Sequence, residues 1–327
     1  MTRSISIGSG SAYAADRLDW AQELADSGLV DYMGFDCLAE RTMALAQIRR
    51  LGDETTGQDE RMAEVMDRFA GYLRRGGKMI GNFGAANPAA AADDVVRGLK
   101  ANGVSGVRIG VIHGDDVLDH VLDQDLELPE MGVTAQAISA QVVSANAYIG
   151  ADPIVDLLHE GAQFVLGGRI ADPSLYVAPI AYEMGWALDD WDKMGVATLV
   201  AHLLECGTHA TGGNYVDPPY RVLDDIVRLG FPMAEVSEDE LVITKLEGTG
   251  GAVDIGTMKT QLAYEIHDPA AYLTPDSTAD FTNVWIEEIG PDRVRVGGAT
   301  GRPRPDTLKV LVGVDQGWKV VTEISYG

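Results

Sequence analysis

Cysteine is scarce in this sequence. The 327 residues include only two cysteines, Cys37 and Cys206, which lie far apart and form no CxxC pair. This usage excludes a disulfide-stapled scaffold and a zinc site built from a cysteine cluster. Two isolated thiols fit a reducing compartment, and we expect a cytoplasmic protein.

Long apolar runs are also missing. No stretch of the sequence approaches the ~20 apolar residues that a membrane-spanning helix requires. Met1, Thr2 and Arg3 lead straight into an alternating, strand-like segment rather than a signal peptide. We therefore expect neither export nor insertion into a membrane.

Positively charged residues are also scarce. Lys and Arg number 25 against 50 Asp and Glu, and the net charge is -25. Such a surface repels phosphate backbones and anionic membranes, so no nucleic acid or membrane partner is expected. The same acidity is equally typical of a salt-adapted or high-GC source. The expected partner is a small anionic substrate, which needs a local cation or a helix N-terminus.

The pattern that is present is that of an α/β protein. Hydrophobic residues make up 46% of the chain, enough for a large core. In the first two-thirds, short apolar runs that end in glycine alternate with longer amphipathic segments, which is typical of βαβ units. We predict a doubly wound, mainly parallel sheet. The expected strands are Ser4–Ile7, Asp31–Phe35, Met79–Asn82, Val107–Ile112 and Phe164–Gly167, and the clearest helices are Ala14–Ser27 and Glu60–Arg75.

A smaller domain is expected after residue 215. The chain exceeds one ordinary compact domain in length, and the composition changes where Pro218 and Pro219 stand together. We predict an α/β ligand-binding domain over 1–215 and a mixed α+β domain over 216–327. Its strand-like runs are Glu240–Lys245, Asn283–Glu288, Val294–Val296 and Trp318–Ser325. Because the last run reaches the end of the sequence, we expect a C-terminal piece to be missing or separately encoded.

Eight ordered segments carry a family resemblance. They are GFDCLAE (34–40), GNFGAANP (81–88), VSANAYIGADPIV (143–155), GGRIADPS (167–174), HLLECGTHATGG (202–213), LGFPMAEV (229–236), ITKLEGTGG (243–251) and YEIHDPAAYLTPD (264–276). In this order they resemble the acyclic terpene utilisation (AtuA-like) family. The resemblance implies a role in the breakdown of branched isoprenoid acids as coenzyme A thioesters. Family members often continue past the position of Gly327, which implies a further segment with part of the site or an oligomer interface.

A first glycine-rich segment is a candidate anion site. Gly8, Ser9, Gly10 and Ser11 follow the first predicted strand and precede a helix. Backbone N–H groups in such a loop can hold a phosphate or carboxylate, and a plain tight turn is the alternative. The third glycine of GxGxxG is absent, which disfavours NAD as a cofactor.

A second segment joins a rare lysine to glycines. Lys245 precedes Gly248, Thr249, Gly250 and Gly251, so a cation stands beside a flexible loop rich in N–H donors. Because the lysine precedes the glycines, the segment is not a Walker A motif, and ATP chemistry is unsupported. We predict a substrate-binding loop, with a hairpin or bulge as the alternative.

Arg169 and Asp172 follow the predicted strand that ends at Gly167. A guanidinium at a strand end can bind a carboxylate through two parallel hydrogen bonds, and a structural ion pair is the alternative. Pro173 stands where a helix can begin, which favours Asp172 as the N-cap. We include both residues in the predicted substrate site.

Carboxylates and amides follow other predicted strands. Asp36 and Glu40 would share a helix face if a helix starts near Asp36, and the two can then divide acid and base roles or bind a divalent metal through oxygen. Asn82, Asn87 and Asn146 can orient a carbonyl or thioester without bringing charge. N-capping and turn formation are the alternatives for these residues. We predict that all five are catalytic.

One predicted helix carries residue types that bind metals. His202, Glu205, Cys206 and His209 fall at helical spacings, and the two histidines with the cysteine can share a face and bind zinc. The family that the chain resembles typically has no His at the position of His209. A packed helix that ends at the Thr-Gly-Gly of 211–213 is the favoured alternative, and we assign no metal ligands.

Together these features predict an enzyme of lyase or hydratase type that uses non-redox chemistry. Its expected substrate is a branched or hydroxylated carboxylic acid or its coenzyme A thioester, and the sequence identifies no cofactor. One alternative is a ligand-binding or assembly subunit without catalysis that needs a partner chain, and another is a metal-dependent hydrolase. We also expect a homo-oligomer or a partner that supplies a C-terminal domain.

Overall fold

The computed structural model describes residues 3–317 and 321 of the chain. Five short apolar strands form the parallel half of its central sheet: β1 (Ser4–Ser11), β2 (Tyr32–Phe35), β3 (Lys78–Gly81), β8 (Phe164–Gly167) and β4 (Ile109–Ile112). They pair in that order, each parallel to the next. All five correspond to predicted strands. Four of them are short runs of mainly apolar residues, as a sheet buried on both faces requires, whereas β1 alternates Ser with Ile and Gly.

Four strands from the later part of the chain extend the same sheet in antiparallel fashion. They are β9 (Pro232–Ser237), β10 (Leu241–Lys245), β14 (Arg293–Gly297) and β13 (Trp285–Gly290). The nine strands lie in the order β13-β14-β10-β9-β1-β2-β3-β8-β4. The mixed sheet confirms the predicted α/β class. Since it takes strands from both 1–215 and 216–327, the division into two domains stays a prediction.

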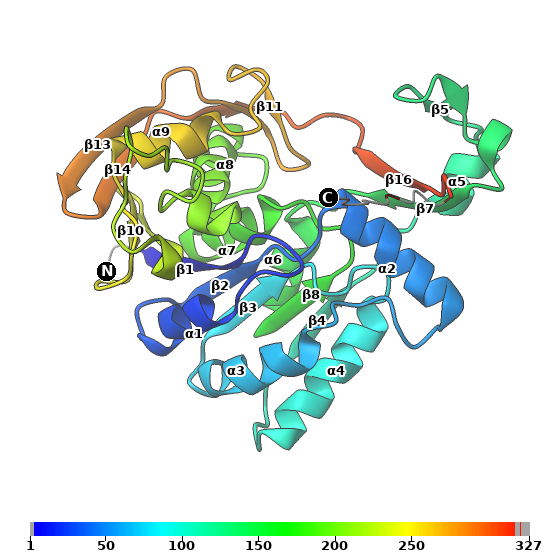
Figure 1. Cartoon of the computed structure of the whole chain (residues 1–327), viewed down its shortest axis with the longest axis horizontal. Helices are drawn as coiled ribbons and strands as arrows, with labels where there is room; N and C mark the ends of the chain where they lie inside the picture. The colour runs from blue at the N-terminus through cyan, green and yellow to red at the C-terminus, as the bar shows by residue number, and fades with distance from the viewer. Residues whose placement is uncertain (1–2, 318–320, 322–327) are drawn as a thin grey trace, which may run out of the picture.

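Helices cover both faces of the sheet (Figure 1). One face packs against α1 (Asp19–Asp26), α3 (Met62–Arg74) and α4 (Pro88–Ala101), and the other against α6 (Asp152–His159), α7 (Ser174–Met184) and α8 (Trp191–Glu205). Side chains alternate between the two faces. Met79 belongs to the first core and Ile80 to the second. This doubly wound arrangement places the carboxyl ends of the parallel strands along one edge.

Smaller elements surround that edge. β7 (Val142–Ala147) pairs with β16 (Val310–Val314) beside α2 (Glu40–Gly52), and β11 (Tyr272–Leu273), β12 (Thr278–Asp280) and β15 (Thr300–Arg302) form a three-stranded sheet next to α8. The remaining elements are α5 (Leu118–Asp123), β5 (Glu127–Leu128), β6 (Val133–Thr134), α9 (Ile255–Ala263) and the 3₁₀ helices η1 (Gln136–Ile138), η2 (Gly207–His209) and η3 (Ile226–Arg228).

The prediction of a glycine loop after the first strand is wrong. Gly8, Ser9, Gly10 and Ser11 belong to β1 itself, which pairs with β2 on one side and β9 on the other. A Cβ added to Gly10 would lie 2.5 Å from the ring of Phe35. The glycines therefore allow neighbouring side chains to pack closely against a buried strand.

Two predicted helix starts are also corrected. Helix α2 begins at Glu40, after Ala39 in extended conformation, so Asp36 lies in the preceding loop and shares no helix face with Glu40. Helix α7 begins at Ser174 without a side-chain cap. The carboxylate of Asp172 is instead bonded to Arg169.

The predicted strand Trp318–Ser325 lies outside the described residues, apart from Val321. Within the part of the chain that the structure describes, no helix combines the length and apolar character needed to cross a bilayer.

Candidate functional site

Polar side chains from three adjacent parallel strands meet at the carboxyl edge of the sheet. Asp36 follows β2, Asn82 follows β3 and Arg169 follows β8. The amide of Asn82 donates to Asp36 Oδ1 at 2.8 Å, and its oxygen accepts the Cys37 N–H at 2.6 Å. Asn82 thus fixes the position of the Asp36 carboxyl group, so these two predicted residues do lie together.

Arg169 is buried behind this edge and is 1% exposed. One terminal nitrogen donates to the carbonyl of Leu38, and the other donates to the carbonyl of Ile170 at 2.8 Å and to Asp172. Its guanidinium carbon lies 4.5 Å from the centre of the Tyr148 ring. Because its terminal nitrogens are used within the protein, Arg169 is placed to hold Asp172 rather than to meet a ligand directly.

Two buried polar side chains, Asp115 and Asn146, hold the backbone at Arg169 in place. Asp115 Oδ2 accepts hydrogen bonds from the Asn146 amide and from the Arg169 backbone N–H, both at 2.9 Å. Asp115 and Asn146 are 6% and 4% exposed. The predicted catalytic residue Asn146 therefore positions the loop after β8 and does not line the cavity described next.

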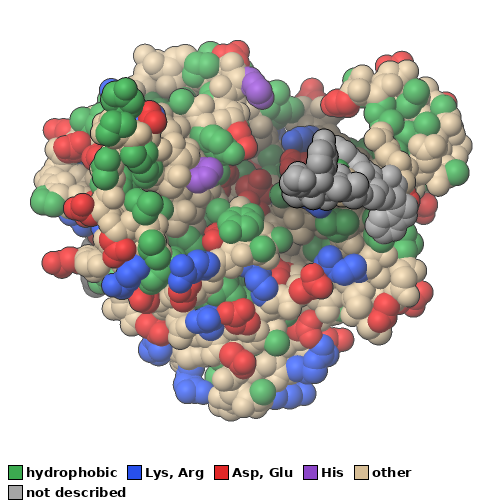
Figure 2. Space-filling view, viewed as in Figure 1, with side chains coloured by type: hydrophobic (Ala, Val, Ile, Leu, Met, Phe, Trp, Pro, Cys, Tyr) green, Lys and Arg blue, Asp and Glu red, His purple; other side chains and the backbone are tan. Residues whose placement is uncertain are grey.

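A cavity of about 700 Å³ opens beside the strand ends. The side chains in its wall that can carry charge or transfer a proton are Glu40, Asp172, Glu205, Glu265, Tyr148, Tyr272, His267 and Lys309. Figure 2 shows a hollow on the displayed face with acidic side chains inside it. We call this space the acid-lined cavity.

Burial changes the protonation of several of these carboxyl groups. Burial raises the pKa of Asp36 well above its ordinary value, and the nearby charge of Asp172 raises it further. Burial also raises the pKa of Asp172 against the opposing effect of Arg169, and that of Glu205 against the opposing effect of His202. Carboxyl groups with a raised pKa are suited to act as proton donors and acceptors near neutral pH.

The cavity wall contains a cluster of three polar side chains from distant parts of the sequence: Glu40, Tyr148 and Lys309. The hydroxyl of Tyr148, after β7, donates to Glu40 Oε1 at 3.1 Å. Lys309 Nζ lies 3.9 Å from Glu40 Oε1 and 4.6 Å from the centre of the Tyr148 ring. Among the described residues that line the cavity, Lys309 is the sole Lys or Arg. It is therefore the cation that an anionic group would meet.

The predicted catalytic residue Asn87 has a structural role. Its side-chain oxygen accepts the Ala90 N–H at 3.2 Å and caps α4, and its amide donates to the carbonyls of Glu54 and Thr56, both at 2.9 Å. These bonds hold the 53–57 segment against the start of α4, and Asn87 does not line the cavity.

The predicted lysine loop lies in the antiparallel half of the sheet. Lys245 ends β10, and its Nζ lies 3.0 Å from Asp292 Oδ2 and donates to the Thr249 carbonyl at 2.8 Å. A Cβ on Gly250 or Gly251 would collide with the backbone of a neighbouring loop. Neither Lys245 nor residues 248–251 line the acid-lined cavity, so this loop is a tightly packed turn.

The four residues with metal-binding side chains do not share one helix as predicted, because α8 ends at Glu205 and His209 ends the 3₁₀ helix η2. His202 bonds to Glu205 and to the Gln261 carbonyl, and the ring of His209 packs against Tyr264 with the ring centres 5.0 Å apart. Over residues 3–317 and 321, no group of three or more His, Cys, Asp or Glu side chains is arranged to hold a metal ion.

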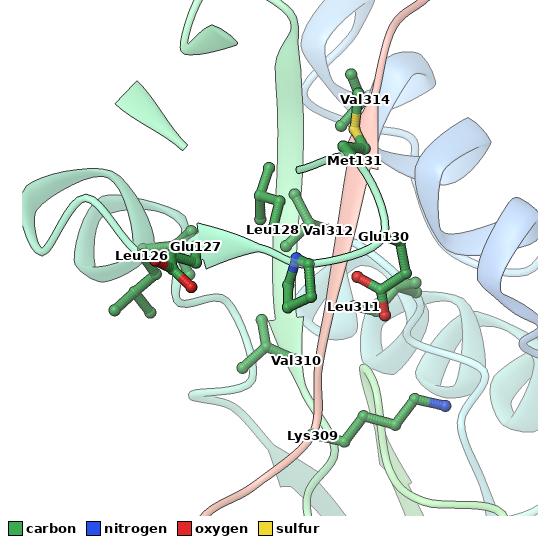
Figure 3. Close-up of a pocket in the computed structure, with 12 residues that line it drawn as sticks. Leu126, Glu127, Leu128, Glu130, Met131, Lys309, Val310, Leu311, Val312 and Val314 are labelled. Atoms are coloured by element: carbon green, nitrogen blue, oxygen red, sulfur yellow. The ribbon is translucent and has the colours of Figure 1, made fainter. Parts of the chain in front are cut away.

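A second hollow, of about 370 Å³, lies between the segment around β5 and strand β16. Figure 3 shows Leu128, Val310 and Val312 gathered there. Lys309 belongs to the walls of both hollows. Among the described residues that line it, the second hollow has mainly aliphatic side chains and only Glu127, Glu130 and Lys309 as charged groups, so these residues offer little acid–base chemistry.

The fold and the acid-lined cavity define the class of this protein: an α/β protein with a ligand-sized cavity at the carboxyl ends of parallel strands. The model of the acyclic terpene utilisation family protein AtuA matches residues 5–327. The chain therefore belongs to this family, as the ordered sequence segments predicted. No curated protein and no solved structure matches the chain.

Proposed function

We propose that the protein is an enzyme of lyase or hydratase type that acts on a branched or hydroxylated carboxylic acid, or on its coenzyme A thioester. The observation that carries the proposal is the pair of partly buried carboxyl groups with raised pKa, Asp36 and Asp172, at the strand ends. Asp172 lines the cavity. Carboxyl groups in such an environment can move a proton to or from carbon.

In this proposal Asp172 is the residue that exchanges a proton with the substrate carbon next to the acid or thioester carbonyl. Arg169 holds the carboxyl group through an ion pair and is itself fixed by the Leu38 and Ile170 carbonyls. Asp36 lies close enough for the charge of Asp172 to raise its pKa, and when Asp36 carries a proton it adds no second negative charge. The proton carrier is thus moved from Asp36 or Glu40 of the sequence prediction to Asp172.

Lys309 and Tyr148 take the binding role that the sequence prediction gave to Arg169 and Lys245. An ammonium group can bind a substrate carboxylate or the phosphates of coenzyme A. Lys309 is well exposed, at 67% of its side chain, and its contact with Glu40 at 3.9 Å is long. The lysine is therefore free to turn toward an anionic ligand.

The family match supports the branched substrate class. The family description names the utilisation of acyclic terpenes, and the carbon skeletons of such compounds are branched. A cavity of about 700 Å³ is of a size that holds a small organic molecule.

The test is a turnover assay on the purified chain with branched and hydroxylated acyl thioesters of coenzyme A and the matching free acids. We expect mass spectrometry to detect gain or loss of water, or cleavage of a carbon–carbon bond. Asp172→Asn should lower the rate on the order of 10²–10⁴-fold. Glu130→Gln, an exposed acid in the wall of the second hollow, is the matched control and should leave the rate unchanged.

No reaction of any of these compounds would contradict the proposal, as would full activity of Asp172→Asn. A second chain that purifies with the protein and is required for turnover would instead favour the assembly-subunit alternative.

A further inference from the structure

Glu205 is a buried acid with one unused oxygen. It ends α8, is 7% exposed, and belongs to the wall of the acid-lined cavity. Its Oε1 lies 3.0 Å from His202 Nδ1, whereas its Oε2 is shielded from solvent and has no hydrogen-bond partner among the described residues. A buried polar atom without a partner is uncommon in native proteins and calls for a ligand or a catalytic role.

The hydrogen bonds of His202 determine where the protons of this pair lie. His202 Nε2 is 3.0 Å from the Gln261 carbonyl oxygen, which can only accept, so Nε2 carries a hydrogen. His202 Nδ1 and Glu205 Oε1 must then share one proton, because two bare acceptors would repel at 3.0 Å. With this proton the pair has no net charge, and Oε2 is open to accept a second proton.

The surroundings of the pair keep it dry and rigid. His202 is 1% exposed, and its ring centre lies 5.4 Å from that of Tyr272 and 6.0 Å from that of Phe281. The Gln261 amide donates to the His202 carbonyl at 2.9 Å. His202 is therefore enclosed and fixed, and Glu205, which belongs to the cavity wall, keeps this partner at its Oε1.

We propose that Glu205, held by His202, is a second proton-transfer residue of the acid-lined cavity, and this rests on the proposed lyase or hydratase function. In water addition, Oε2 takes a proton from water as the water oxygen forms a bond to the β-carbon of an α,β-unsaturated thioester. The electron pair of the carbon–carbon double bond moves to the α-carbon, which takes the proton of Asp172.

The protons of this step balance within the cavity. As Oε2 accepts its proton, the proton that Glu205 Oε1 shares with His202 moves onto Nδ1. The pair then returns its extra proton through solvent to Asp172, so the net change is the addition of one water. The reverse sequence eliminates water from a β-hydroxy thioester.

The first test needs no substrate. Nitrogen NMR of the His202 ring in the folded wild-type protein should show a hydrogen on Nε2 and a shared proton at Nδ1. In Glu205→Gln the amide cannot share a proton, and Nδ1 should stay bare. A bare Nε2, or a Nδ1 signal that Glu205→Gln leaves unchanged, would overturn the proposed pairing.

The second test separates the two proton-transfer residues. Glu205→Gln should lower water addition to an α,β-unsaturated branched thioester by at least about 100-fold. Exchange of the α-hydrogen of the saturated thioester with D₂O, which uses Asp172, should continue. Glu130→Gln should keep both reactions, and thermal unfolding checks that each variant is folded.

The outcomes of this test distinguish the two proposals. Unchanged water addition by folded Glu205→Gln, or equal loss of both reactions, would overturn the role of Glu205. Absence of both reactions from the wild-type protein would count against the proposed function, and the NMR result would still decide the proton arrangement of Glu205 and His202.

Discussion

Two ion pairs, one from each half of the central sheet, lie in different environments. At the ends of the parallel strands, Arg169 is buried and donates to two backbone carbonyls and to the partly exposed Asp172, and burial raises the pKa of Asp172 and of nearby Asp36. On the antiparallel half, Arg293 and Glu235 form a partly exposed pair at 2.6 Å, and the hydrogen bond from Arg293 lowers the pKa of Glu235.

The two environments have different consequences for the stability of the fold. An exposed ion pair between neighbouring strands contributes little because water screens it. A buried carboxyl group is unfavourable in its charged form and persists where the fold supplies partners. The parallel half therefore holds reactive groups in place, whereas the antiparallel half extends the sheet.

The largest effect is expected from removing the buried arginine. Arg169→Met should destabilise the protein by about 3 kcal/mol or more, because Asp172 loses its ion pair and the Leu38 and Ile170 carbonyls lose their donor. Urea unfolding followed by circular dichroism measures this. If Arg169→Met lowered the free energy of unfolding no more than removal of an exposed ion pair does, the two halves of the sheet would not differ in how their charged groups affect stability.

The next largest loss of stability is expected from a substitution in β1, the strand at which the parallel and antiparallel halves of the sheet meet. Gly10→Ala should cost between about 1 and 3 kcal/mol, because its Cβ meets the Phe35 ring. Gly52→Ala, at the end of α2, is the control, since a Cβ there has nothing within 4 Å. Equal unfolding temperatures for the two variants would contradict close packing at Gly10 and would favour the predicted open loop at residues 8–11.

A buried acid next to the cavity should make stability depend on pH. Burial raises the pKa of Asp276 to about 6, although it accepts hydrogen bonds from Ser174 and the Ala151 N–H. The folded protein then binds a proton more tightly than the unfolded chain, so stability from this group is present at low pH. It is lost as pH rises through about 4 to 6.

Asp276→Asn should therefore be more stable than the wild type at pH 7 by about 3 kcal/mol, from 1.36 kcal/mol for each unit between 3.8 and about 6. Below the ordinary pKa of aspartate the two proteins should be equally stable. Unfolding curves of both proteins across this pH range give the difference. A variant that is less stable at pH 7 would show that Asp276 is needed in its charged form.

The smallest effect is expected on the antiparallel half. Arg293→Met removes the partly exposed pair with Glu235 and should change the free energy of unfolding by less than about 1 kcal/mol. The loss should shrink further in high salt, because screening weakens exposed pairs. If Arg293→Met lowered the free energy of unfolding as much as Arg169→Met, charged pairs in the two halves of the sheet would contribute equally to stability.

The fold was largely predictable because its signals are local. Runs such as Phe164–Gly167 are continuous and apolar, and Pro88 after Asn87 begins a helix, so each element is marked within a few residues. The segment 8–11 misled because Gly-Ser-Gly-Ser is typical of a loop. Its burial depends on Phe35, which belongs to the next strand of the sheet.

The site was less predictable because its parts meet only in the folded chain. Asp36, Asn82, Arg169 and Asp172 each follow a predicted strand, and parallel strands end at one edge of a sheet, so their proximity is predictable. Lys309 was not predicted, because nothing near this residue in sequence shows that β16 pairs with β7 and brings it to Glu40.

Glu205 was considered only as a metal ligand, because spacing along a helix does not show which cavity a side chain faces. The unused Oε2 atom and the Gln261 carbonyl that fixes His202 appear only in the structure.

The most direct measurement is the unfolding temperature of the wild type and of Lys309→Met with coenzyme A, branched and hydroxylated acyl thioesters, and the matching free acids. Selective binding to the folded state raises this temperature. We expect a rise with thioesters or acids in the wild type and a much smaller rise in Lys309→Met. No rise with any compound, or equal rises in both proteins, would contradict a substrate site in the acid-lined cavity.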